Sequence, residues 1–301
     1  MQCIQKVSNA TLADWPRPGK RETGLLNLSG TSDVSYGADD MSENANATAS
    51  SPFSLKGRVA LVTGSSAGLG RALATALGEA GAKVAWNYCN DTARAEERFK
   101  AFKAKGGEGM LVRGNATNEV EVERMIADVG KRLGPVDIVV INATCDQPQK
   151  PIEGYDWAFF QRMIDFFIKS PFLLTRACLP HMKKQRWGRI INIGTEAVQR
   201  GMPNFSAYVA AKGGQNGLHR SLATELAPYG ITVNMISPGW IPVERHEEVP
   251  AGEKEAYFKL IPAKRWGVPA DLGGAVVFLA SDAASFITGQ NIAVNGGMTV
   301  S

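Results

Sequence analysis

The sequence predicts an α/β fold in which a doubly wound, seven-stranded parallel sheet carries helices on both faces. Two observations predict this class. Short apolar runs alternate with longer amphipathic stretches from residue 56 onward, as in sheets whose strands are joined by crossover helices. Hydrophobic residues make up 44% of the 301-residue chain, which is ample for a large core. At this length the chain could form one large α/β domain or two small ones.

The predicted strands and helices follow one another along the chain. The seven apolar runs are "RVALVTG" (58–64), "KVAWNY" (83–88), "GMLVRG" (109–114), "VDIVVINA" (136–143), "RIINIG" (189–194), "ITVNMIS" (231–237) and "NIAVNGG" (291–297). Between the first four runs, residues 70–81, 91–107 and 118–134 have apolar residues at helical spacing. The first two of these stretches end in glycine, as a left-handed C-cap requires. Right-handed crossovers then place the ligand site beyond the carboxyl ends of the strands.

Two later segments have less regular patterns. Residues 156–182 carry apolar side chains on several faces, so we expect this helix to pack against another subunit. Residues 240–267 mix charged and aromatic side chains. We expect this segment to form a mobile lid over the site, because loops on a rigid scaffold commonly carry specificity.

The first 54 residues have a different character. They are polar, rich in Ser, Asn, Thr and Gly, and lack both helical and alternating periods. This composition predicts a disordered N-terminal tail, followed by a folded domain over residues 55–301. Because Met41 opens a second plausible start, one hypothesis is that residues 1–40 are a start-site artefact. N-terminal sequencing that finds residues before Met41 would contradict it.

Composition and charge argue against several function classes. The 33 Lys and Arg residues exceed the 29 Asp and Glu residues only slightly and are dispersed, so no cationic stripe for nucleic acid is expected. No apolar run reaches the roughly 18 residues of a membrane span. The four cysteines and three histidines show no metal-ligand spacing, so we expect no metal site. We expect a protein of the cytoplasm, whose reducing conditions suit unpaired cysteines.

A glycine-rich turn follows the first predicted strand. In "TGSSAGLG", residues 63–70, Gly64, Gly68 and Gly70 allow backbone N–H groups to approach a pyrophosphate at the start of a helix. Such an octet alone could be only a flexible turn. Its position between the first strand and the first helix favours dinucleotide binding. The chain lacks a G-x-x-x-x-G-K-S/T phosphate loop, so ATP or GTP hydrolysis has no support.

Several motifs in a fixed order carry a resemblance to a known family. The turn T-G-x-x-x-G-x-G precedes "NAT", "GRIINIGT", the Y-x-x-x-K of "FSAYVAAKGG", "VNMISPGW" and "ITGQNIAVNGG". Over residues 55–301 the chain resembles the short-chain dehydrogenase/reductase family, and within it the 3-oxoacyl-acyl-carrier-protein reductases and glucose dehydrogenases. The resemblance implies one Rossmann-like catalytic domain that binds NAD or NADP, in a homotetramer or homodimer.

Tyr208 and Lys212 are the predicted catalytic pair. Being four residues apart, they share one face of a helix. A neighbouring ammonium favours the phenolate and lowers the pKa of a tyrosine. The resemblance implies that Tyr208 transfers the proton at the substrate oxygen, and that Lys212 lowers the tyrosine pKa and binds the nicotinamide ribose. It also implies that Thr195, thirteen residues before the tyrosine, replaces the serine that usually steadies the substrate oxygen.

The resemblance further implies which residues line the cofactor site. They are Gly64, Ser66, Gly68, Leu69, Gly70, Asn87, Tyr88, Asn115, Ala116, Asn142, Ala143, Tyr208, Lys212, Pro238, Gly239 and Ile241. Tyr88 stands where NAD-preferring members have an aspartate that repels a phosphate, so the main obstacle to NADP is missing. Ala67 replaces the arginine that NADP users often have. We expect NADP as the preferred cofactor, with NAD as the alternative.

Three residues depart from the family pattern near the expected site. Phe167 replaces an asparagine that helps to hold a water between the lysine and solvent. Thr144 replaces a glycine beside the cofactor, and Val243 stands where a threonine often bonds the carboxamide or the phosphates. These changes raise the possibility of an unusual substrate or of a slower enzyme.

Together these features predict an NAD(P)-dependent oxidoreductase. It would transfer a hydride between nicotinamide and a carbonyl or secondary alcohol of a small or carrier-bound substrate: a 3-oxoacyl thioester, a ketone or a sugar. One alternative is a weak or inactive NAD(P)-binding sensor or assembly protein, for which Phe167 is the best support. Another is a nucleotide-sugar epimerase, which usually has a T-G-x-x-G-x-x-G turn and a longer C-terminal domain. The intact Tyr208 and Lys212 argue against an inactive protein.

Overall fold

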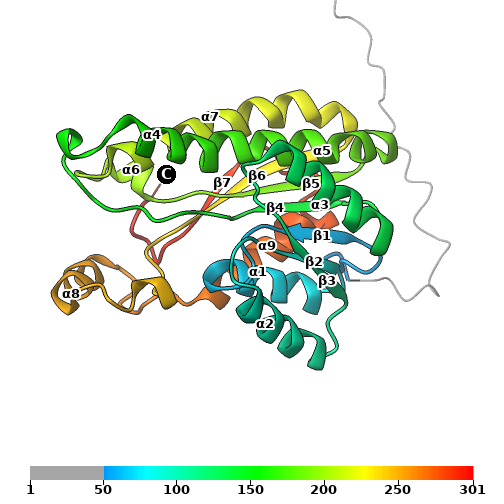
Figure 1. The fold of residues 1–301 in the computed structure, drawn as a ribbon, viewed down its shortest axis with the longest axis horizontal. Helices are drawn as coiled ribbons and strands as arrows, with labels where there is room; N and C mark the ends of the chain where they lie inside the picture. Colours follow the sequence, from blue (N-terminus) through cyan, green and yellow to red (C-terminus); the bar gives the residue numbers. More distant parts are fainter. Residues whose placement is uncertain (1–50, 301) are drawn as a thin grey trace, which may run out of the picture. The chain divides into compact units, whose positions relative to one another are not determined.

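A computed structural model describes residues 51–300, which form one parallel sheet with helices on both faces (Figure 1). The strands are β1 (Val59–Val62), β2 (Lys83–Tyr88), β3 (Gly109–Arg113), β4 (Ile138–Ile141), β5 (Gly188–Ile193), β6 (Ile231–Pro238) and β7 (Asn291–Val294). Their order is β3-β2-β1-β4-β5-β6-β7, and every neighbouring pair is parallel. The predicted seven-stranded, doubly wound sheet is confirmed.

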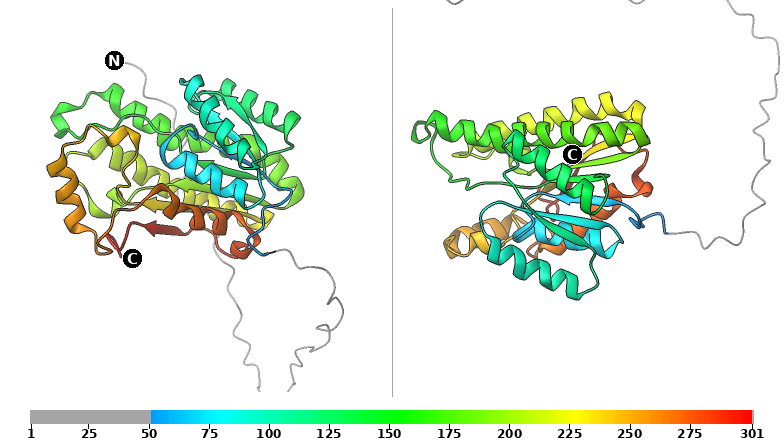
Figure 2. Two further views of the ribbon diagram at one scale, coloured as in Figure 1. Left: turned by 90° about the horizontal axis from the view of Figure 1, so that it is seen from below. Right: turned by 45° about the vertical axis from the view of Figure 1, so that its right-hand side comes forward.

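Nine α-helices connect or cover these strands in the described part of the chain (Figure 2). They are α1 (Gly68–Glu79), α2 (Thr92–Ala104), α3 (Glu119–Arg132), α4 (Trp157–Ile164), α5 (Ser170–Gln185), α6 (Ala197–Arg200), α7 (Ser206–Leu226), α8 (Ala251–Leu260) and α9 (Gly273–Ala280). The three predicted crossover helices are α1, α2 and α3. Gly81 and Gly106, which follow α1 and α2, have φ values of 100° and 86°, as left-handed caps require.

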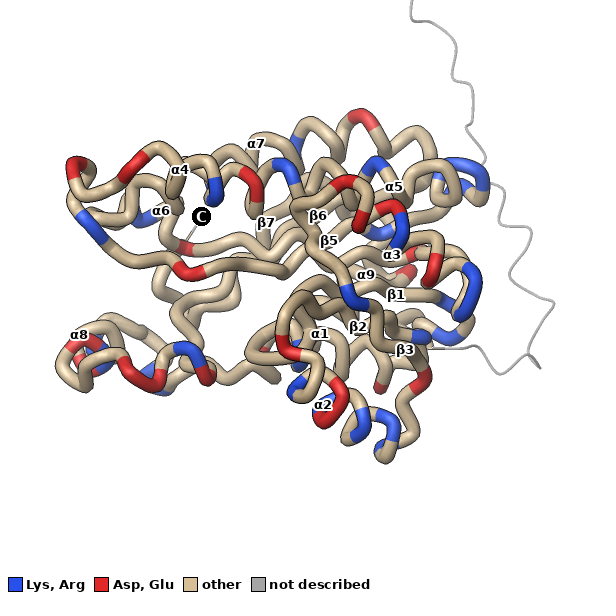
Figure 3. The backbone as a smooth tube through the Cα atoms, viewed as in Figure 1, with Lys and Arg blue, Asp and Glu red and all other residues tan. Residues whose placement is uncertain are grey.

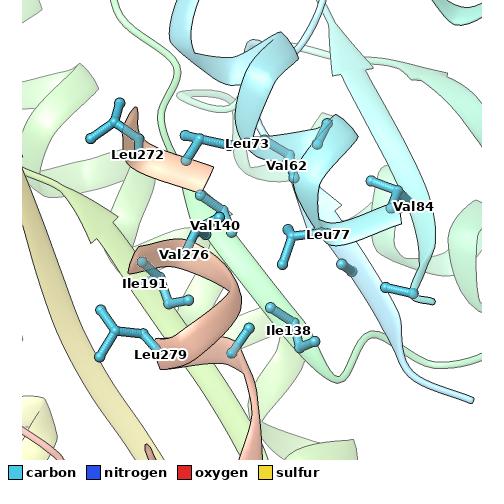
Figure 4. Close-up of a cluster of buried hydrophobic side chains, with 14 of the residues drawn as sticks. Val62, Leu73, Leu77, Val84, Ile138, Val140, Ile191, Leu272, Val276 and Leu279 are labelled. Atoms are coloured by element: carbon cyan, nitrogen blue, oxygen red, sulfur yellow. The ribbon is translucent and has the colours of Figure 1, made fainter. Parts of the chain in front are cut away.

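Alternating strand residues build two cores, one on each face of the sheet. Ala60 and Val62 of β1 belong to the cluster that contains the buried leucines and valines of α1 and α9 (Figure 4). Val59 and Leu61, which point to the other face, belong to the cluster beneath α3, α5 and α7. Because both faces are covered, β1 is buried along its whole length. This rigid centre carries the loops at the carboxyl ends of the strands.

The helical region predicted over residues 156–182 is divided in the structure. A π-helical turn, Asp165–Lys169, lies between α4 and α5. The wider turn contains Phe167, whose side chain is only 2% exposed. Such turns are rare and commonly occur at functional sites.

The beginning of the folded part lies a few residues before the predicted position. The Ala283 N–H donates to the Pro52 carbonyl over 3.2 Å, and the rings of Phe53 and Phe278 lie 6.4 Å apart. Pro52 and Phe53 fall within the predicted tail, so its last residues contact the domain. The remainder of that tail, including the proposed start at Met41, lies outside the described residues.

Charged residues of both signs are interspersed along the backbone of the described part (Figure 3). Some ion pairs lie within one helix, such as Lys259 to Glu255 in α8 at 2.8 Å. None of the helices in residues 51–300 is both long enough and apolar enough to cross a membrane.

Candidate active site

The candidate site lies beyond the carboxyl ends of β1 and β4. Here the strand order reverses, since β1, β2 and β3 extend across the sheet in one direction and β4, β5 and β6 in the other. The glycine turn after β1 is held from two sides. Asn142, which follows β4, donates its Nδ2 to the carbonyls of Thr63 and Gly64 over 2.9 and 3.3 Å. Asn87 of β2 accepts the Gly64 N–H at its Oδ1 over 3.2 Å. The turn is therefore preformed by the strands on either side of it.

Asn87 lies behind the glycine turn. We expected it to contact the cofactor, but its side chain is buried, with the whole residue 2% exposed. Its Nδ2 donates to the carbonyls of Val112 and Gly114 over 3.3 and 2.9 Å, while its Oδ1 holds Gly64. Every polar atom of the side chain is thus engaged within the protein, and Asn87 supports the turn from behind.

Gly70 lies at the tightest point of the turn. A Cβ at this position would lie 2.2 Å from the Gly64 oxygen and 2.5 Å from Asn142 Nδ2. Gly68 lies at the start of α1, and its N–H donates to the Glu244 carboxylate over 3.1 Å. Ala67, the residue before the helix, has no polar side chain and therefore does not cap α1. A cradle closed to side chains, with an N–H that already binds an anion, fits a pyrophosphate.

We expect Gly70→Ala to disrupt this cradle. Overpacking against backbone typically costs about 1–3 kcal/mol, and the shift of Asn142 should weaken NADPH binding by roughly tenfold or more, since tenfold corresponds to about 1.4 kcal/mol. NADPH fluorescence titration and thermal unfolding measure the two effects. Gly130→Ala is the matched control, because a Cβ at this position in α3 meets no atom within 4 Å. Unchanged NADPH affinity in Gly70→Ala would contradict the assignment.

The other predicted cofactor residues lie around the same edge of the sheet. Tyr88 ends β2, Asn115 and Ala116 follow β3, and Ala143 follows β4. Pro238 ends β6, and Gly239 and Ile241 follow it; Ser66 and Leu69 belong to the glycine turn and the start of α1. The Asn115 Oδ1 already accepts two hydrogen bonds from Thr117.

Helix α7 brings Tyr208 and Lys212 to this edge. The Nζ atom of Lys212 donates to the Ile193 carbonyl over 2.6 Å and to Gln215 Oε1 over 3.0 Å. It also lies 4.0 Å from the ring centroid of Phe167. The Lys212 residue is only 6% exposed, so these contacts replace water around the amine. Gln215, three residues further along α7, was not predicted; its spacing from the lysine was the only available signal.

The electrostatics of the pair differ from the prediction. Burial raises the pKa of Tyr208, and the Thr195 side chain and then Arg245 oppose this rise. Burial, followed by the positive charge of Arg245, lowers the pKa of Lys212 to about 7. Lys212 is not among the groups that lower the pKa of Tyr208, whereas the sequence predicts that its ammonium does so. Burial thus shifts the pKa of Tyr208 upward and the pKa of Lys212 downward, each toward its neutral form.

Thr195 lies directly after β5, on the loop that faces α7. Its Oγ1 accepts the Ala197 N–H over 3.2 Å, and its side chain interacts with Tyr208. The three residues predicted to be catalytic are thus brought together by β5 and α7.

Phe167 packs against both members of the pair. Its ring lies edge-on to the Tyr208 ring, with centroids 5.3 Å apart, and beneath the Lys212 amine. The phenyl ring offers the amine a π face where the family pattern has an asparagine amide. The replacement therefore fills the space around the lysine with carbon.

The segment predicted to form the lid contains the helix α8 and a cluster of aromatic rings. The Trp240 ring lies 5.2 Å from the Tyr257 ring and 5.9 Å from the Trp266 ring. Val243 lies against the glycine turn, since a Cβ at Gly68 would be 3.5 Å from its Cγ2. One end of the segment therefore contacts the glycine turn, and the segment continues from there into α8.

Comparisons with known proteins agree with this arrangement. The family model described as enoyl-(acyl carrier protein) reductase matches residues 64–299. A 3-oxoacyl-acyl-carrier-protein reductase of Staphylococcus epidermidis is 40% identical over 241 residues, covering 79% of this chain and 98% of that protein. One from Synechocystis is 39% identical over 249 residues, covering 82% and 98%.

Solved structures give the same result. A gluconate 5-dehydrogenase of Burkholderia cenocepacia, in complex with NADP and tartrate, is 31% identical with a TM-score of 0.77, covering 82% of this chain and 97% of that one. A 3-oxoacyl (acyl-carrier-protein) reductase of Agrobacterium tumefaciens with NADP bound is 31% identical with a TM-score of 0.76, covering 81% and 95%. The chain therefore belongs to the short-chain dehydrogenase/reductase family.

Proposed function

We propose that the protein is an NADP(H)-dependent oxidoreductase that interconverts a carbonyl and a secondary alcohol. The observation that carries this proposal is the convergence of Tyr208, Lys212 and Thr195 beside a preformed glycine turn. The two similar solved structures that contain NADP support the cofactor. Tyr88, which ends β2 in place of an acid, leaves room for the additional phosphate.

The proposal gives each residue a task. NADPH, when bound, supplies the hydride that is added to the carbonyl carbon. Tyr208 donates its hydroxyl proton to the carbonyl oxygen, which becomes the alcohol; the raised pKa of Tyr208 keeps this proton in place before the reaction. Thr195 donates a hydrogen bond to the same oxygen and orients it. Lys212 holds the end of β5 through the Ile193 carbonyl and presents its amine to the ribose.

The direct test follows NADPH and NADH consumption at 340 nm. The panel includes acetoacetyl thioesters and ketones and, in reverse, aldoses and gluconate, because the relatives are named for 3-oxoacyl groups and gluconate. We expect turnover with NADPH on at least one substrate. Tight NADPH binding without turnover on any of them would favour the non-catalytic sensor or assembly protein instead.

Glu244 is expected to compete with the cofactor phosphates. Its carboxylate binds the N–H of Gly68, the N–H assigned above to the pyrophosphate. Because an anion at a helix N-terminus is worth ~0.3–1 kcal/mol, we expect Glu244→Gln to tighten NADPH binding about two- to fivefold. Fluorescence titration measures the dissociation constant. Glu247→Gln, three residues further in an exposed position, should leave it unchanged; equal affinities for both variants would refute the competition.

We propose that the protein acts as a homodimer or homotetramer of the cytoplasm. Trp157 of α4 and Phe172 of α5 support the assembly, since they are 70% and 47% exposed on the helices predicted to meet another subunit. Large exposed apolar groups of this kind commonly mark interfaces. Light scattering should give two or four times the 32.3 kDa chain mass. A stable monomer at micromolar concentration would contradict the proposal.

A further inference from the structure

The Tyr257 hydroxyl joins the lid helix to the two loops that frame the site. It accepts the Trp240 backbone N–H over 2.7 Å and donates to the Glu196 Oε1 over 2.7 Å. Trp240 directly follows Pro238 and Gly239, two of the predicted cofactor residues. Glu196 directly follows Thr195. One oxygen atom on α8 therefore connects the loop after β6 with the loop after β5.

Glu196 is held firmly on its own side of this connection. The residue is only 3% exposed, and its Oε1 also accepts from Arg200 Nη1 over 2.8 Å. Its backbone N–H donates to the Pro238 carbonyl over 3.3 Å. A buried carboxylate is costly unless it is paired, so its partners constrain it to this position. Movement of Tyr257 would therefore leave a charged acceptor less well satisfied.

The ring of Tyr257 is positioned independently of its hydroxyl. It stacks on the Trp266 ring, with centroids 5.8 Å apart and planes 13° apart, and meets the Trp240 ring edge-on. Burial and the Glu196 carboxylate raise the pKa of Tyr257, so that its hydroxyl remains a donor across the range in which enzymes are assayed. A phenylalanine would keep the ring contacts and lose only the bridging oxygen.

We propose that Tyr257 is a positioning residue, whose hydroxyl fixes the Pro238–Ile241 loop relative to Thr195. This inference rests on the proposed function, in which Thr195 orients the substrate oxygen and the loop lines the cofactor. The two loops carry the two reactants, so their separation determines how well the hydride donor and the carbonyl align. Small misplacements of this kind are expensive: about 1 Å can cost roughly a hundredfold in rate.

The kinetic test compares Tyr257→Phe with wild type and with Tyr229→Phe. We expect Tyr257→Phe to lower kcat by roughly 10- to 100-fold, while the NADPH dissociation constant changes by less than about threefold, since most cofactor contacts lie on other loops. Tyr229, a partly exposed residue following α7, provides the same chemical change far from the bridge. Unchanged kcat in Tyr257→Phe would overturn the proposal.

A second measurement does not depend on turnover. Hydrogen exchange of peptides covering residues 238–246, in the presence of NADPH, reports whether the Trp240 N–H and its loop are held. We expect faster exchange in Tyr257→Phe than in wild type or Tyr229→Phe, with the strands of the sheet unchanged. Identical exchange would overturn the bridge even if no substrate is found. If Tyr257→Phe exchanges faster but the wild-type protein turns over no substrate, the result would count against the proposed function and not against the bridge.

Discussion

Replacing Tyr208 by phenylalanine is expected to lower kcat by at least about a thousandfold, because general acid catalysis by a positioned side chain contributes roughly 10²–10⁴-fold. The substitution removes only the hydroxyl. The ring should stay in place through its contacts with Phe167 and Phe205, whose centroids lie 5.3 and 4.6 Å away. NADPH binding should therefore change by less than about threefold.

The measurement is steady-state turnover at 340 nm combined with fluorescence titration of NADPH. Tyr229→Phe serves again as the matched loss of one hydroxyl. A Tyr208→Phe variant that kept a tenth of the wild-type kcat, with normal NADPH binding, would show that another group donates the proton. A large loss of NADPH binding would indicate instead that the substitution changed the shape of the site.

Replacing Lys212 by methionine is expected to have two effects. Turnover should fall by at least about a hundredfold, since the amine orients the reacting groups. The stability of the cofactor-free protein should also lose a pH dependence. Burial lowers the pKa of Lys212 to about 7 in the folded state, whereas a lysine in the unfolded chain has a pKa near ~10.4.

The sign of this pH dependence follows from the proton counts. Below pH 7 the Lys212 amine is protonated in both the folded and the unfolded protein, so the folded state carries the full free-energy penalty of burying the charge. Between this pH and ~10.4 only the unfolded chain holds the proton, so the free energy of unfolding of wild type rises with pH, by up to about 1.4 kcal/mol per pH unit from this group. Methionine has no proton to lose and gives no such rise.

Urea unfolding at two pH values, ~7.5 and ~9.5, isolates the contribution. The stability of wild type minus that of Lys212→Met should increase by roughly 2–3 kcal/mol between them, while contributions from all other groups cancel. Lys103 lies at an exposed position near the end of α2, so the free energy of unfolding of Lys103→Met should change with pH as that of wild type does. If the free energy of unfolding of Lys212→Met also changed with pH as that of wild type does, the buried amine would keep its proton in the folded state.

Much of the fold could be predicted because it depends on local patterns. The run "KVAWNY" and strand β2 have the same limits, Lys83–Tyr88, since a strand buried on both faces is rich in apolar residues. Gly81, which ends the first predicted helix, and Gly106, next to the end of the second, adopt positive φ for a steric reason that acts on single residues. The spacing of Tyr208 and Lys212 placed both side chains on one helix face, whatever the rest of the structure did.

Other features depended on contacts between distant parts of the chain. The buried role of Asn87 requires Val112 and Gly114, which β3 brings beside β2. The bond between Tyr257 and Glu196 spans 61 residues and has no local signature. The pKa directions of the catalytic pair followed from desolvation, which is a property of the packed site. The π-helical turn around Phe167 likewise interrupts a region whose sequence reads as one continuous helix.

Under the proposed function, in which Gly68 binds the pyrophosphate, the contact between Glu244 and Gly68 links the expected lid thermodynamically to the cofactor. The carboxylate is tethered to the protein, so its competition is independent of protein concentration and acts as a fixed reduction in the apparent affinity for NADPH. Linkage is reciprocal. The docked Glu244 lowers the affinity for NADPH by some factor, and bound NADPH lowers the equilibrium constant for docking of Glu244 by the same factor. A saturating cofactor therefore shifts the lid segment toward the undocked state, and does so before any substrate arrives.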